Sequence, residues 1–163
     1  MKGFEPAVLA LAQALHGAGL KLATAESCTG GLIAAACTAV AGSSDWFERG
    51  FVTYSNDAKT ELLGVDAALI DAHGAVSAEV AKAMADGALQ HSRADLAVAV
   101  TGIAGPSGAT PGKPVGTVWL AVAQRGAGTQ VELLQLDGDR AAVRQQTVHH
   151  ALLRLVARAA AVR

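Results

Sequence analysis

Ser27 lies in the segment TAESCTGG (residues 24–31), where an apolar run ends and a helical run begins. The N-terminus of a helix presents free backbone N–H groups with a partial positive charge. Such groups can hold a phosphate, or stabilise the oxyanion that forms when a serine attacks a carbonyl carbon. The segment therefore predicts a nucleophile, Ser27, beside donors at Thr29, Gly30 and Gly31. An ordinary helix cap formed by Ser27 or Thr29 fits the same residues.

Tyr54 and Lys59 belong to a second segment, YSNDAK (residues 54–59), at the junction of an expected strand and an expected helix. A lysine in the first turn of a helix is opposed by the helix dipole. Together with partial burial, this repulsion lowers the lysine pKa and makes a neutral amine available to take a proton from a serine. Lys59 and Tyr54 are therefore the candidate base. A solvated lysine and a half-buried aromatic residue are the alternative.

Candidate substrate-binding residues stand at two further places. Thr101 and Gly102 follow an all-apolar run, and ligands of open α/β sheets collect beyond the carboxyl ends of the strands. Arg140 and Arg144 are one helical turn apart and can grip a phosphate from one face. A simple turn and a solvated helix face are the alternatives.

Metal and cofactor chemistry finds no support in the sequence. The five histidines are scattered, and none has a metal-ligand spacing with cysteine, aspartate or glutamate. A phosphate loop or a dinucleotide fingerprint is not present either, so we expect no metal and no cofactor. Cys28 is a rival nucleophile beside Ser27, but we expect it to turn inward and pack as a small hydrophobic residue.

Length and composition point to one domain in a reducing compartment. The chain has 163 residues, 52% of them hydrophobic, and a net charge of −1, which suits a single domain spanning residues 1–163. A nucleic-acid partner is not expected without a basic surplus. Neither a signal peptide nor a membrane span is recognisable, so we expect a cytoplasmic protein. Homodimers are the commonest assemblies, and we expect one here.

The elements that must position these residues alternate along the chain. Periodicity and caps predict helices at residues 6–17, 32–40, 57–63, 78–91 and 140–160, with Asn56, Ser77 and Asp139 as three of the caps. Apolar or β-branched runs predict strands at residues 20–25, 51–54, 96–100, 115–123 and 129–136, the last two forming a hairpin. Residues 102–116 predict a long irregular loop. This order favours an α/β fold, a three-layer α/β/α sandwich with a mixed sheet.

Seven segments, taken together, resemble one known family. They are TAESCTGG (24–31), AGSSDWF (41–47), GFVTYSN (50–56), GAVS (74–77), TGIAGP (101–106), KPVGTV (113–118) and GDR (138–140). Their sequence and order are similar to those of the CinA C-terminal domain family, and within it to the stand-alone, PncC-like nicotinamide mononucleotide amidases. The resemblance covers about residues 5–160. One departure is the loop at residues 107–112, which is poor in acidic side chains.

The resemblance implies a hydrolase that converts nicotinamide mononucleotide to nicotinate mononucleotide and ammonia, for NAD salvage and without a metal. It implies Ser27 as the nucleophile and Tyr54 with Lys59 as its basic partners. The expected reaction is acyl transfer, with backbone N–H groups at 29–31 holding the oxyanion. Two other functions remain open: a Ser-Lys amidase for another small amide, and a non-catalytic module that binds a nucleotide or another partner.

Overall fold

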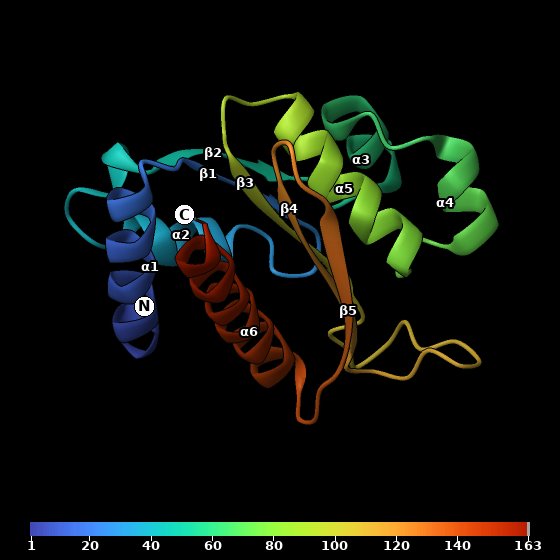
Figure 1. Ribbon diagram of the computed structural model, residues 1–163. Helices are drawn as coiled ribbons and strands as arrows, with labels where there is room; N and C mark the ends of the chain where they lie inside the picture. Colours follow the sequence, from blue (N-terminus) through green and yellow to red (C-terminus); the bar gives the residue numbers. More distant parts are fainter. Residues whose placement is uncertain (163) are drawn as a thin grey trace.

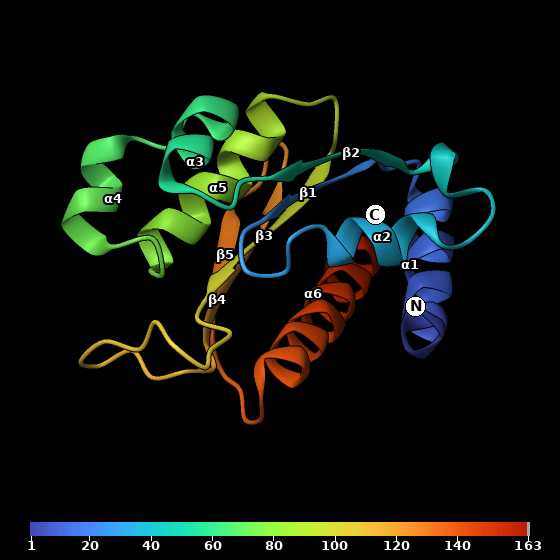
Figure 2. The same cartoon turned by 180° about the vertical axis from the view of Figure 1, so that it is seen from behind.

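A five-stranded mixed sheet lies between two layers of helices in the computed structural model, which describes residues 1–162 (Figure 1). In chain order the elements are η1 (Lys2–Phe4), α1 (Glu5–Ala18), β1 (Leu22–Glu26), α2 (Leu32–Thr38), η2 (Ser43–Asp45), β2 (Phe47–Val52), α3 (Asn56–Leu63), α4 (Ala67–His73), α5 (Ala78–Gln90), β3 (Leu96–Gly102), β4 (Thr117–Gln124), β5 (Thr129–Gln135) and α6 (Arg140–Ala161). The expected three-layer sandwich is confirmed. Figure 2 shows α1, α2 and α6 on one side of the sheet and α3, α4 and α5 on the other.

The strand order β2-β1-β3-β4-β5 places β1 between two parallel neighbours. The chain leaves β1 toward β2 on one side and returns to β3 on the other, so the connections diverge between β1 and β3. In an open α/β sheet such a point leaves a crevice beyond the carboxyl ends of the strands. The expected hairpin of β4 and β5 is also confirmed, and its first strand, β4, pairs antiparallel with β3.

The two faces of the sheet carry side chains of different size. Leu96, Val98 and Val100 of β3 belong to the core cluster that packs under α1 and α6. The alternating residues Ala97 and Ala99 join the cluster around α5 instead, because successive side chains of a strand point to opposite faces. These small side chains let α5 approach the sheet closely.

Helix α3 approaches α5 just as closely, through a glycine. A Cβ atom at Gly87 of α5 would collide with the carbonyl oxygen of Leu63 at the end of α3. The position of α3 therefore depends on α5, and through α5 on the alanine face of the sheet. This chain of contacts matters because α3 carries Lys59.

The final helix follows the sequence prediction closely. The Asp139 carboxylate accepts a hydrogen bond from the N–H of Ala142 at 2.9 Å, and the helix runs for 22 residues. Val143, Val148 and Leu152 are fully buried on one face, while arginines stand on the remaining surface. No helix within residues 1–162 is both long enough and apolar enough to cross a membrane.

Two local expectations were wrong, and one helix was missed. Strand β2 begins at Phe47 and ends at Val52, so Tyr54 follows the strand instead of ending it. Ser55, not Asn56, caps α3, because its side chain accepts from the N–H of Ala58. Helix α4 was not expected; it has only seven residues and a single buried side chain, Ile70, too few for a periodic pattern.

Candidate active site

Ser27 and Lys59 meet at the carboxyl end of β1. Ser27 is the first residue after the strand, and the Nζ atom of Lys59 lies 3.1 Å from its Oγ atom, although the two residues are 32 positions apart. The Lys59 side chain is only 1% exposed, whereas Ser27 is half-buried. The structure therefore places a buried amine against a hydroxyl that a ligand can reach.

The chain segment before α3 explains why Lys59 points toward β1. Its ammonium also donates to the carbonyl oxygens of Thr53 at 3.0 Å and Tyr54 at 3.4 Å, just before the helix begins. Burial removes the charged group from water and lowers the pKa of Lys59 below its ordinary value of 10.5. Burial is therefore the main cause of the lowered pKa that the sequence suggested.

The three partners of Nζ suit a neutral amine as well as an ammonium ion. An ammonium group has three donors and no acceptor. A neutral amine can keep its hydrogens on the two carbonyl oxygens and turn its lone pair toward Ser27. In that state the Ser27 hydroxyl donates to Nζ, which is the arrangement needed for general-base catalysis.

The Tyr54 side chain takes a different position from the one expected for a proton relay. Its ring is 59% exposed, and its hydroxyl accepts a hydrogen bond of 3.0 Å from Nη2 of Arg140. The hydrogen bond between Lys59 and Tyr54 uses the main-chain oxygen of Tyr54. Arg140 also donates from Nη1 to the carbonyl oxygen of Gly105 at 2.9 Å. Tyr54 and Arg140 together form a polar rim beside Ser27 and Lys59.

The turn after Ser27 differs from the expected helix N-terminus. Helix α2 begins at Leu32, after Gly31 with φ 106°, a conformation that glycine adopts readily. The Glu26 carboxylate accepts from the N–H groups of Ile33 and Ala34, at 2.8 and 3.0 Å. This buried carboxylate therefore already occupies the positive end of α2.

Of the three expected peptide donors, Gly30 is already engaged. Its N–H donates to the carbonyl oxygen of Ser27 at 3.0 Å. The N–H groups of Thr29 and Gly31 both find no acceptor within residues 1–162. Both therefore remain available as donors, and Thr29 is the one nearer to Ser27 in the chain; its buried side chain donates to Glu26 at 2.6 Å.

A cavity of about 200 Å³ adjoins Ser27 and Lys59. Of the residues proposed from the sequence, it is lined by Ser27, Lys59, Tyr54, Thr101, Gly102 and Arg140, but not by Thr29, Gly30 or Gly31. Strand pairing brings Thr101 here, because the preceding residue, Val100, accepts from the Ser27 N–H at 3.1 Å. The other five thus line the same cavity as Ser27, and they come from β3, α3, α6 and the segment between β2 and α3.

Sequence reasoning missed four lining residues: Asn56, Ala75, Val76 and Ala104. The Ala75 carbonyl oxygen accepts a hydrogen bond from Oγ1 of Thr101 at 2.8 Å, which joins two parts of the cavity wall. Ala75 and Val76 belong to one of the seven family segments. Nothing in their side chains suggested chemistry, so only that segment could have drawn attention to them.

Cys28 is buried, as expected, but it lines the cavity beside Ser27 and does not join either core cluster. Its side chain is 6% exposed, and burial raises the pKa of its thiol from 9.0 to about 11. The thiolate is the nucleophilic form of cysteine. Cys28 is therefore a poor rival to Ser27, despite lying beside it in the chain.

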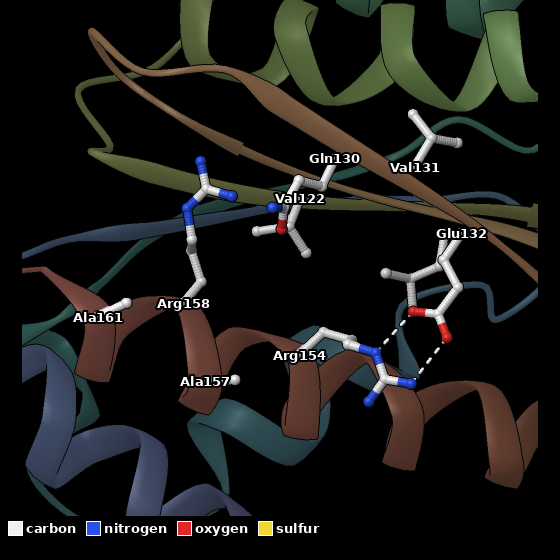
Figure 3. Close-up of a pocket in the computed structure, with 9 residues that line it drawn as sticks. Val122, Gln130, Val131, Glu132, Arg154, Ala157, Arg158 and Ala161 are labelled. Carbon is white, nitrogen blue, oxygen red and sulfur yellow. Dashed lines mark hydrogen bonds and ion pairs between the residues drawn. The ribbon is translucent and has the colours of Figure 1, made fainter.

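A larger hollow of about 520 Å³ lies elsewhere, between α6 and strands β4 and β5 (Figure 3). Its charged groups already have hydrogen-bond partners. Arg154 forms a forked interaction with both oxygens of Glu132, at 2.6 and 2.7 Å, and Arg158 donates to Gln124 at 2.8 Å. Without a nucleophile or a free carboxylate, this hollow offers no comparable chemistry.

Comparisons with known proteins place the chain in a family. The CinA C-terminal domain model matches residues 5–159. A CinA-like protein of Citrifermentans bemidjiense is 60% identical over 142 residues, which are 87% of this chain and 34% of that protein. The chain spans about a third of the length of the first relatives that it matches.

Two further relatives match over nearly their whole length. The nicotinamide-nucleotide amidohydrolase PncC of Escherichia coli K12 is 55% identical over 142 residues, covering 86% of this chain and 85% of that protein. The crystal structure of the competence/damage inducible protein CihA from Agrobacterium tumefaciens has a TM-score of 0.92 and 48% identity, covering 94% of both chains. The fold is thus shared with the protein from Agrobacterium tumefaciens.

Proposed function

Because this chain belongs to the CinA C-terminal domain family, we propose that it hydrolyses the carboxamide of nicotinamide mononucleotide to give nicotinate mononucleotide and ammonia. The similarity to the Escherichia coli protein PncC, a nicotinamide-nucleotide amidohydrolase, supports this substrate. The observation that carries the proposal is the buried Lys59 amine, 3.1 Å from the Ser27 hydroxyl. We propose that residues 1–163 act as a single domain.

The proposed reaction begins with neutral Lys59, which removes the proton of Ser27 as Oγ attacks the amide carbon. The oxyanion then collapses, and the C–N bond breaks as the Lys59 ammonium returns the proton to the departing nitrogen. Ammonia leaves and a Ser27 ester remains. Lys59 next takes a proton from water, whose oxygen attacks the ester, and Ser27 recovers its proton as the acid departs.

The other residues of the site hold the substrate in this scheme. The Thr29 N–H donates to the oxyanion, and Thr101 and Gly102 form the wall beside the reacting amide. The Arg140 guanidinium has donors beyond those given to Tyr54 and Gly105, and we assign them to the phosphate. Tyr54 positions Arg140 at the mouth of the cavity.

The substrate assignment predicts a preference for the phosphorylated compound. In a coupled ammonia assay, kcat/KM for nicotinamide mononucleotide should exceed that for the unphosphorylated riboside by about tenfold or more, since a hydrogen bond to a charged group contributes about 1.5–3 kcal/mol. Arg140→Gln should remove most of this preference. Equal efficiency in the parent would rule out the phosphate contact, and release of ammonia from neither compound would rule out the amidase. A module that only binds nucleotides would bind the mononucleotide without turnover.

The proposed base also predicts a pH dependence. Only the deprotonated amine can act, so kcat/KM should rise with pH and level off above the pKa of Lys59. Burial lowers that pKa, so the rise should be centred below 10.5. Rates measured from about pH 6 to pH 10 at constant ionic strength test this. A rate that falls across the same range would contradict a lysine base.

A further inference from the structure

The turn between Ser27 and α2 is held from two sides by charged groups. At the end of β1, the wholly buried Glu26 carboxylate accepts from the Thr29 hydroxyl and from the N–H groups of Ile33 and Ala34 in the first turn of α2. From α6, Arg144 donates through Nε to the carbonyl oxygen of Cys28 at 3.2 Å, and through Nη2 to that of Thr29 at 3.3 Å. The sequence offered Arg144 as a partner of Arg140 for a phosphate, but its fork instead meets two main-chain oxygens.

The direction of one peptide group follows from these contacts. The Cys28 carbonyl and the Thr29 N–H belong to the same planar trans peptide, so they point in opposite directions. Arg144 holds the carbonyl end toward α6 and thereby turns the N–H end away from α6. The next peptide is held at both ends: the Thr29 carbonyl accepts from Arg144 and from the Leu32 N–H, and the Gly30 N–H donates to the carbonyl oxygen of Ser27.

We infer that Arg144 is a positioning residue, which aligns the Thr29 N–H to donate to the oxyanion formed when Ser27 attacks the substrate. This inference rests on the proposed amidase function and deepens it. Arg140 and Arg144 then have different roles although they share a helix face: Arg140 lines the cavity, whereas Arg144 lies behind the turn. A planar guanidinium suits the task because its fork can meet two adjacent carbonyl oxygens at once.

Arg144→Met tests the inference, because methionine keeps an apolar stem and lacks the donors. Removing an oxyanion donor costs about 100- to 1000-fold in rate, and a donor that is only misaligned should cost less, roughly 10- to 100-fold in kcat. KM for nicotinamide mononucleotide should stay within about threefold, since this contact forms in the transition state. The pH profile should keep its midpoint, because Lys59 and Ser27 are untouched. Arg144→Lys should recover part of kcat, as one ammonium can reach one carbonyl oxygen.

Arg158→Met is the matched control. Arg158 lies on the same helix and also donates to a main-chain oxygen, that of Gly128, but far from Ser27. This variant should keep the parent kcat. Melting temperatures of the variants show whether each protein is folded.

The outcomes separate this inference from the proposed function. A parent protein that releases no ammonia overturns the amidase itself. An active parent with unchanged kcat in Arg144→Met, or with a raised KM at unchanged kcat, overturns the positioning role alone. If Arg144→Met does not fold, Arg144→Lys decides: a folded variant with reduced kcat and an unshifted pH midpoint supports the role, and a parental kcat refutes it.

Discussion

Ser27→Ala should lower the rate of ammonia release from nicotinamide mononucleotide by more than about 1000-fold. Losing one oxyanion donor costs about 100- to 1000-fold, and losing the nucleophile removes the covalent route altogether. Ser27 is half-buried, so the small deletion should leave the fold intact. The measurement is kcat/KM in the ammonia assay, with a thermal melt of each protein. Mass spectrometry of a quenched reaction should show an acyl adduct on the parent and none on the variant.

Two companion variants make the result specific. Ser92→Ala removes a hydroxyl near the end of α5 that only accepts from the N–H of Ala94, and it should keep full activity. Cys28→Ala should keep most of it, because a buried thiol with a pKa of about 11 has little thiolate at neutral pH. Near-parental activity in Ser27→Ala would refute the proposed nucleophile.

Lys59→Met should reduce kcat/KM by about 100- to 10,000-fold, the range for losing a positioned general base. Lys59→Arg should be equally impaired, because a guanidinium keeps the positive charge but does not give up its proton. An active Lys59→Arg protein would show that charge, not basicity, is what the site requires. Lys82→Met is the control, since Lys82 is an exposed lysine that pairs with Asp86 on α5.

Lys59→Met also tests the burial of the Lys59 amine without an activity assay. Because the folded state lowers the pKa of Lys59, the unfolded chain binds one more proton between that value and 10.5. The free energy that Lys59 contributes to folding must therefore rise with pH across this window. Denaturant titrations should show the parent gaining stability relative to Lys59→Met as the pH is raised. A constant difference would mean that the amine titrates normally.

The sandwich was predictable because its signals are local. Buried strands such as β3 appear as unbroken apolar runs, and Ser77 and Asp139 cap helices within three residues of their partners. The dependence on local signals also explains why the bounds of β2 were predicted wrongly. Strand β2 carries charged residues and has only intermediate or exposed positions, so its first half shows no buried run.

The site was predictable only as separate pieces. The segments around Ser27 and Lys59 could each be assigned to the end of a strand or the beginning of a helix, but their 3.1 Å contact depends on packing between layers. The capping of α2 by Glu26 and the approach of Arg144, 116 residues beyond Cys28, depend on it as well. A cytoplasmic location and a homodimer remain predictions.

The alanine face of the sheet has a consequence for how the protein tolerates change. The size of the side chains between the sheet and α5 affects the distance from α3 to β1. This distance decides whether the Lys59 side chain can reach Ser27. On the α6 side, one aliphatic side chain can replace another of similar volume with little effect on this span. Under α5, each added methyl group should push α5 and α3 away from the sheet and so increase the distance between Lys59 and Ser27. Substitutions in the core under α1 and α6 are therefore limited by stability alone. Substitutions in the core around α5 are limited also by the distance that the Lys59 side chain must span.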